Sequence, residues 1–251
     1  MNSIIKKIVA AVVTVSLCSF GMAKASENET GVKFAVQSDL VSSYIWRGMY
    51  QTGASFQPTL AFSVAGFSLT AWGSTDFDGY RSSEGLANKE IDLTAAYTFG
   101  ASGLTLSIAD LWWAGQGANK YFNFKSHETA HHFEAGLAYT FPLEKFPLSL
   151  AWYTMFAGQD KDAEGNQNYS SNVELNYPFS VKRVDLTATC GLVPYEAAQY
   201  YTSGFAVTNV ALKGTTAIKI TDSFSLPIFA QAIWNPRLED AHLVFGFTLK
   251  P

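Results

Sequence analysis

The chain has 251 residues and a formal net charge of −4; 15% of its residues are charged and another 15% are aromatic. Soluble domains carry about 25% charged residues, so this composition is unusual for a protein surrounded by water. The acidic balance argues against a nucleic-acid partner, because such partners need basic surfaces. Beyond the first 25 residues, no stretch offers the roughly eighteen consecutive apolar residues of a membrane-spanning helix.

The beginning of the chain has the pattern of an export signal. Lys6 and Lys7 precede an apolar run, and Ala23-Lys24-Ala25 supplies the small residues of a cleavage site. We therefore expect residues 1–25 to be removed and residues 26–251 to form one domain. That domain keeps 14 of the 17 basic residues against all 21 acidic ones, a formal net charge of −7. Cys190 is its single cysteine, so no internal disulfide is expected.

Apolar and polar residues alternate with a period of two along most of the mature chain, which predicts β-strands. About twelve strands are expected, at 32–46, 56–64, 67–75, 89–99, 104–113, 131–141, 148–156, 169–177, 183–192, 207–221, 224–234 and 242–249. Long polar connections alternate with short turns between them. An even-stranded up-and-down barrel with both termini at one end has this arrangement.

The two faces of the strands differ in chemistry. One face is apolar, and the other carries small polar residues with few charges, fewer than a water-exposed surface has. This favours an all-β, transmembrane antiparallel barrel with short periplasmic turns and long extracellular loops, whose apolar face meets lipid. A soluble barrel of lipocalin type would be oriented the other way.

Strand parity predicts two sets of site residues. The candidate lumen-lining charges are Lys33, Asp39, Arg47, Glu90, Asp92, Glu134, Glu174, Arg183, Asp185, Lys213 and Lys219. They either brace the barrel as internal ion pairs or set a transverse field across a pore. The candidate aromatic girdle is Tyr44, Trp46, Tyr97, Phe99, Tyr139, Phe141, Trp152, Tyr177 and Trp234. Ordinary core packing is the alternative explanation for these aromatic residues.

Asp110 departs from this pattern. Its parity places a carboxylate on the apolar face beside Leu106 and Ile108. A bulge, a strand end or an error in the expected register would explain it.

Two short motifs resemble metal sites. The segment His127-Glu128-Thr129-Ala130-His131 matches the H-E-x-x-H of zinc proteases, but its flanks predict a loop entering a strand, where the two histidines lie too far apart to share one zinc ion. Asp160, Asp162 and Glu164 imitate half of a calcium loop, but Ser171 stands where the final glutamate belongs. We expect no metal and no cofactor.

A barrel lipid hydrolase would need a serine and a histidine close together near the lipid interface. Ser126 or Ser170 with His131 are the available candidates, and no local pattern supports either pair. We therefore expect no catalytic residues and no enzymatic activity.

The segment Ser43-Tyr44-Ile45-Trp46-Arg47-Gly48, followed by Gln51-Thr52, Gln57-Pro58 and Trp72-Gly73-Ser74, resembles the TorF-type porins, a family of small bacterial outer-membrane β-barrels. Glu90-Ile91-Asp92 with Tyr97 continues the likeness, which covers residues 38–99 well. The resemblance implies the outer membrane of a Gram-negative bacterium, with membrane lipid and small solutes as partners.

The last predicted strand carries Phe245, Phe247 and Leu249 at alternate positions. This resembles the terminal signal read by the barrel-assembly machinery, and it implies that this machinery and periplasmic chaperones act during biogenesis. We expect a porin-like channel for passive diffusion of small hydrophilic solutes. The alternatives are a non-conducting barrel with a structural or loop-mediated binding role and, third, an outer-membrane lipid hydrolase.

Overall fold

The computed structural model describes residues 31–77, 88–114, 120–143 and 147–250. The expected export signal lies outside the described residues. Among those residues, no helix is long and apolar enough to cross a bilayer.

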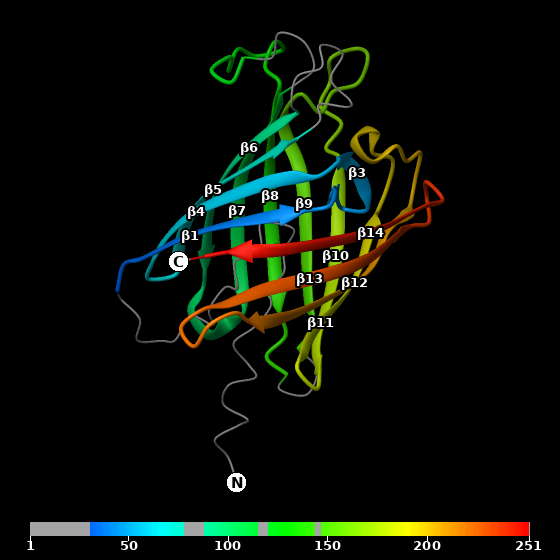
Figure 1. Ribbon diagram of the computed structural model, residues 1–251. Helices are drawn as coiled ribbons and strands as arrows, with labels where there is room; N and C mark the ends of the chain where they lie inside the picture. Colours follow the sequence, from blue (N-terminus) through cyan, green and yellow to red (C-terminus); the bar gives the residue numbers. More distant parts are fainter. Residues whose placement is uncertain (1–30, 78–87, 115–119, 144–146, 251) are drawn as a thin grey trace.

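Twelve antiparallel strands close into a single barrel (Figure 1). They are β1 (Lys33–Val41), β4 (Ser55–Val64), β5 (Phe67–Asp76), β6 (Lys89–Thr98), β7 (Leu104–Ala114), β8 (His131–Thr140), β9 (Ser149–Gly158), β10 (Ser171–Val181), β11 (Val184–Val193), β12 (Ala206–Lys219), β13 (Ser225–Asn235) and β14 (Asp240–Leu249). Each of β4 to β14 pairs with its neighbours along the chain, and β1 closes the ring between β4 and β14. The predicted up-and-down barrel is confirmed.

Short and long connections lie at opposite ends of the barrel. The end with the short connections, near residues 65–66, 99–103, 141–148, 182–183 and 220–224, is called the turn end. The opposite end, with the connections after β1, β5, β7, β9, β11 and β13, is called the loop end; these connections are long except for the last one, residues 236–239. β1 begins and β14 finishes at the turn end, as an even number of alternating strands requires.

The wall of the barrel is apolar outside and polar inside. Large apolar side chains exposed on the outer face include Val36, Leu60, Leu69, Leu93, Leu106, Ile108, Leu137, Leu212, Leu243 and Phe245. Polar side chains buried inside include Gln57, Thr59, Ser74, Glu90, Thr94, Glu134, Glu174 and Asn176. A soluble barrel has the reverse distribution.

The first strand is shorter than predicted, and the expectation of one strand from Val32 to Trp46 is wrong. Strand β1 ends at Val41. At the next position the backbone N–H of Ser42 still donates to the Phe245 carbonyl (2.8 Å), but the N–H of Phe245 donates to the Ser42 hydroxyl (2.9 Å) and not to a backbone carbonyl. The chain then turns away from the wall. It forms a separate two-stranded hairpin of β2 (Tyr44–Trp46) and β3 (Met49–Thr52).

Two residues, Arg47 and Gly48, form the turn of this hairpin with φ angles of 49° and 83°. Two-residue hairpins favour turns with positive φ at both central positions, and a glycine at the second position suits this geometry. Tyr44 and Trp46 therefore keep the period of two while belonging to a different sheet from β1.

The seam between β1 and β14 is short. Strand β1 pairs with β4 over all nine residues from Lys33 to Val41, but its register with β14 covers only Ser38 to Val41, opposite Leu249 to Gly246. Residues 33–37 thus lie beyond the end of β14.

Candidate functional site

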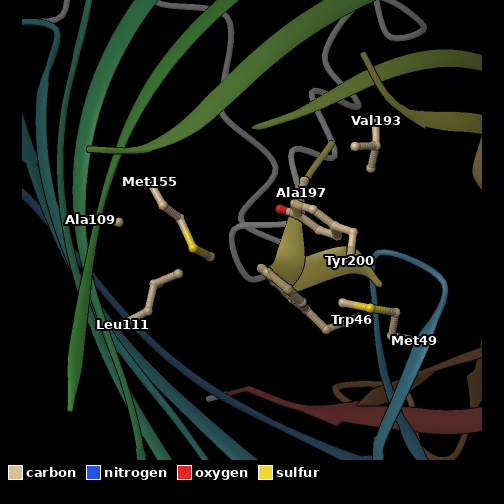
Figure 2. Packing of buried hydrophobic residues seen from close by; sticks show 8 residues of the cluster. All are labelled: Trp46, Met49, Ala109, Leu111, Met155, Val193, Ala197 and Tyr200. Atoms are coloured by element: carbon tan, nitrogen blue, oxygen red, sulfur yellow. The ribbon is translucent and has the colours of Figure 1, made fainter. Parts of the chain in front are cut away.

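The β2–β3 hairpin enters the barrel. Trp46, which is 5% exposed, belongs to one buried cluster with Leu111 of β7, Met155 of β9 and Val193 of β11 (Figure 2). Strands β7, β9 and β11 are not neighbours in the wall, so a side chain packed among residues of all three lies inside the ring. The assignment of Tyr44 and Trp46 to an outward girdle is therefore wrong.

Arg47 at the tip of the hairpin forms a bidentate ion pair with Glu134 of β8. Its Nη1 donates to Oε2 (2.6 Å) and its Nη2 donates to Oε1 (2.8 Å). The same Nη1 also donates to the hydroxyl of Tyr200 (2.5 Å), which lies in the short 3₁₀ helix η3 (Ala198–Tyr200) of the β11–β12 connection. Arg47 is 4% exposed and Glu134 is 3% exposed, so this pair is shielded from solvent.

Aromatic rings cover both sides of the guanidinium group. Its Cζ lies 4.7 Å from the centroid of the Trp46 ring and 4.4 Å from that of Tyr153 on β9. Trp46 in turn stacks on Tyr200 with centroids 5.6 Å apart and an interplanar angle of 15°. Desolvated cation–π contacts contribute about 2 kcal/mol each in favourable cases, so the rings add to the ion pair.

The electrostatic surroundings keep Arg47 charged. Burial is the largest single influence and lowers the pKa of Arg47, but Glu134, Tyr200 and Glu174 together outweigh it, and the pKa of Arg47 is raised. Burial also raises the pKa of Tyr200, which keeps its hydroxyl protonated.

The backbone of the hairpin tip is fixed against strands β12 and β13 of the wall. A Cβ atom on Gly48 would lie 2.0 Å from the carbonyl oxygen of Thr208 on β12, so only glycine fits there. The amide of Asn235 on β13 donates to the Gly48 carbonyl (3.1 Å). The hairpin thus extends across the interior from β1 and β4 to β8, β12 and β13.

Further acids lie around this crossing. The Tyr44 hydroxyl donates to Oε1 of Glu90 (3.2 Å), and its ring packs edge-on against Trp72 of β5 with centroids 5.4 Å apart. Glu174 is 2% exposed. Oδ1 of Asp92, Nε of Arg47 and the Tyr153 hydroxyl are buried with no hydrogen-bond partner among the described residues.

The interior is packed near the loop end and more accessible near the turn end. On β4 the inward residues Ser55, Gln57 and Thr59 are buried, whereas Ala61 and Ser63 toward the turn end are partly exposed. On β12 Ala211 is buried and Lys213 is partly exposed. The lumen is therefore narrower at the loop end than at the turn end.

The other predicted lumen charges lie apart from this cluster. Asp39 accepts from the Thr248 hydroxyl (2.5 Å), and the Lys213 ammonium lies 4.2 Å from the centroid of Phe229. Asp185, which accepts from Ser180, is exposed near the turn end, as are Lys33 and Lys219, the latter paired with Asp222 (2.5 Å). Arg183 does not line the lumen as predicted, because it lies in the exposed β10–β11 turn.

The remaining girdle candidates lie on the outer face. Tyr97, Phe99, Trp152 and Trp234 are exposed, and Tyr139, Phe141 and Tyr177 are partly exposed. Tyr97 contacts Phe99 edge to face with centroids 4.9 Å apart, and Tyr139 contacts Phe141 in the same way at 5.0 Å, both near the turn end.

A second pair of polar side chains lies on the outer wall and explains Asp110. The register through β6, β7 and β8 is regular at this residue, so Asp110 does face outward. Its Oδ1 lies 2.6 Å from Nδ1 of His131 on β8, and Nε2 of His131 lies 2.5 Å from the Tyr121 carbonyl. Both ring nitrogens of His131 are therefore engaged by oxygen atoms of residues 110 and 121.

The β7–β8 connection covers this pair with aromatic rings. His131 is 0% exposed, with its ring 4.3 Å from Phe124 and 5.2 Å from Tyr121 between centroids. Tyr121 also packs edge-on against Trp112 of β7 at 5.3 Å. Burial raises the pKa of Tyr121, with Asp110 adding to the effect. Phe122 beside them is 87% exposed.

These contacts bear on the hydrolase and zinc hypotheses. Both ring nitrogens of His131 are engaged, so the ring is not available as a base, and the Ser170 hydroxyl donates to Asp160 instead (2.7 Å). The segment from His127 to His131 is a turn leading into β8 and not a helix. No cluster of three or more metal-ligating side chains occurs among the described residues.

The calcium-like segment is a hydrogen-bonded turn. Asp162 accepts from the backbone N–H of Asn166 (2.7 Å) and from its amide (3.0 Å). These bonds, chiefly the side-chain one, lower the pKa of Asp162. Its carboxylate is thus already used to shape the β9–β10 connection.

Several residues of the interior cluster were not predicted from the sequence. Gly48 could have been recognised, because Arg47-Gly48 between two aromatic-rich segments is a two-residue hairpin signal. Tyr153 and Tyr200 carry no local signal, since their role depends on which strands and loops meet across the barrel.

Comparison of the sequence with protein-family models and with curated proteins finds no match. We therefore infer the function from the closed barrel and from the geometry of its interior.

Proposed function

We propose that this protein is an outer-membrane β-barrel that passes small hydrophilic solutes through a lumen narrowed by the β2–β3 hairpin. The membrane location is supported by the ring of exposed apolar side chains on the outer face of the wall, which we call the apolar belt. Apolar surface left in water costs about 25 cal/mol per Å², and a closed ring of exposed Leu, Ile, Val and Phe is stable only beside lipid. Each wall strand pairs with two neighbours, so the ring has no open sheet edge, which is the condition for crossing a bilayer.

The channel part of the proposal is supported by the polar inner wall and by the position of Arg47. The guanidinium group lies where the hairpin crosses the lumen, paired with Glu134 and near Glu174. Charged groups at a constriction select among solutes. We therefore expect a narrow, selective channel and not a wide porin. The TorF-type porins remain the family that we propose on the residues of the first hairpin.

Single-channel recording in planar bilayers tests this proposal. Gly48→Ala would place a methyl group against the Thr208 carbonyl, so the hairpin could not seat and the conductance should rise several-fold over the parent. Gly165→Ala is the matched control: Gly165 also has a positive φ, of 87°, but nothing lies within 4 Å of its Cβ position. It should conduct like the parent.

A non-conducting barrel is the second candidate, favoured by the apolar cluster that fills the loop-end half of the interior. Silence of both the parent and Gly48→Ala in the same bilayers would support it and refute the channel.

A further inference from the structure

We infer that the barrel interior contains a binding site for small planar organic cations of the guanidinium class, and that Arg47 occupies this site as a tethered ligand. The inference deepens the proposed function, because it names the class of solute that the constriction accepts.

The contacts of Arg47 are those by which proteins recognise a free guanidinium group. One carboxylate binds both Nη atoms at 2.6 and 2.8 Å, one hydroxyl accepts a further bond at 2.5 Å, and two rings cover the faces at 4.4 and 4.7 Å. Planar bidentate pairing and aromatic stacking are properties of guanidinium that a spherical ammonium lacks. The site is therefore selective for shape as well as for charge.

Most of the site stays in place when the hairpin leaves. Glu134 and Tyr153 belong to the wall strands β8 and β9, and Tyr200 belongs to η3; of the contacting groups only Trp46 moves with Arg47. The Tyr153 hydroxyl is buried with no hydrogen-bond partner among the described residues, so it offers a further bond to a ligand larger than the arginine head group.

The hairpin is able to leave. Its two strands pair only with each other, as a sheet separate from the wall. An isolated two-stranded hairpin is marginally stable. It is held by side-chain contacts and by one hydrogen bond to its tip: the ion pair of Arg47 with Glu134, the packing of Tyr44 and Trp46, and the Asn235 bond to Gly48. A tethered group competes with free ligand at an effective concentration in the millimolar range for a short linker, so a free cation of this class can displace it at comparable concentrations.

Thermal unfolding of the Arg47→Ala variant in detergent tests the site directly. Methylguanidinium should raise its Tm in a saturable manner at millimolar concentrations, because a ligand that binds only the folded state stabilises it. Urea has nearly the same shape without the charge and should have no such effect. Arg47→Ala combined with Glu134→Gln should lose at least tenfold in affinity, and Arg183→Ala, which keeps Arg47 in place, should need a higher concentration of methylguanidinium than Arg47→Ala for the same shift.

The parent protein supplies a second arm that does not depend on any variant folding. Displacement of the hairpin exposes the peptide bonds after Trp46 and Tyr50, so methylguanidinium should increase chymotryptic cleavage there, and urea or sodium at the same concentration should not.

Equal effects of urea, or undiminished binding in the double variant, would overturn the inference. Binding in detergent without conductance in bilayers would refute the channel and leave the site standing. Conductance that rises in Gly48→Ala, without methylguanidinium binding in either arm, would support the channel and refute the guanidinium site.

Discussion

Two connections at the loop end fold onto the barrel in opposite directions. The first connection, which contains the β2–β3 hairpin, folds into the lumen and is fixed by Arg47 and Glu134. The β7–β8 connection folds over the outer wall, where Asp110 and His131 lie beneath it. Each place combines a pair of polar side chains with a cover of aromatic rings, although one faces the lumen and the other faces the apolar belt.

The two pairs differ in whether the loop itself contributes one of the two paired residues. Arg47 belongs to the hairpin itself, so loss of its partner removes the main attachment of that loop. Asp110 and His131 both belong to wall strands, and His131 contacts the outer loop through the Tyr121 carbonyl, the Thr129 hydroxyl and the packing of Tyr121 and Phe124. We conclude that the inner loop depends on electrostatics and the outer loop mainly on packing.

The largest effect is expected from Glu134→Gln. The substitution leaves the guanidinium of Arg47 buried without a counter-charge, and breaking a buried ion pair in this way costs about 3–5 kcal/mol of the free energy of unfolding. Urea unfolding in detergent micelles measures it. Glu164→Gln, which neutralises an exposed loop carboxylate, is the control. Equal stability of both variants would show that the hairpin is not held by charge.

A smaller effect is expected from Asp110→Asn. The substitution replaces the carboxylate that bonds His131 by a neutral amide, which lowers the free energy of unfolding by about 2 kcal/mol. The aromatic contacts of the outer loop remain. Tryptic cleavage after Lys120 and Lys125 should increase modestly, and conductance should not change. Asp222→Asn, at an exposed turn, should leave cleavage as in the parent. A conductance change in Asp110→Asn would contradict the separation of the two loops.

The smallest effect is expected from Tyr200→Phe. The ring keeps its stacking on Trp46 while the hydroxyl that accepts from Arg47 is lost, a change of about 1 kcal/mol for a single hydrogen bond. Thermal unfolding measures it, with Tyr201→Phe at a mostly exposed position as the control. A loss as large as that of Glu134→Gln would mean that the phenol, and not the carboxylate, is the main anchor of the hairpin.

The fold was predictable from the sequence because the period of two and the alternation of loop lengths are local properties. The interior site was predictable only in part. Arg47 and Glu134 were both assigned to the lumen by parity, but Tyr44 and Trp46 keep the parity of β1 after the chain has left that strand, so parity alone placed them on the wrong face. The partner of Asp110 depends on the register between β7 and β8, which no local pattern contains.

The short seam between β1 and β14 has a consequence for the membrane location proposed above. Strand β1 is paired on both sides only from Ser38 to Val41, and the register of β10 with β9 likewise ends at Asn176, so the wall is lowered at both places. Unpaired backbone groups are not tolerated in hydrocarbon. We therefore expect hydrophobic mismatch at these two places, with lipid tails locally shortened or head groups drawn inward there.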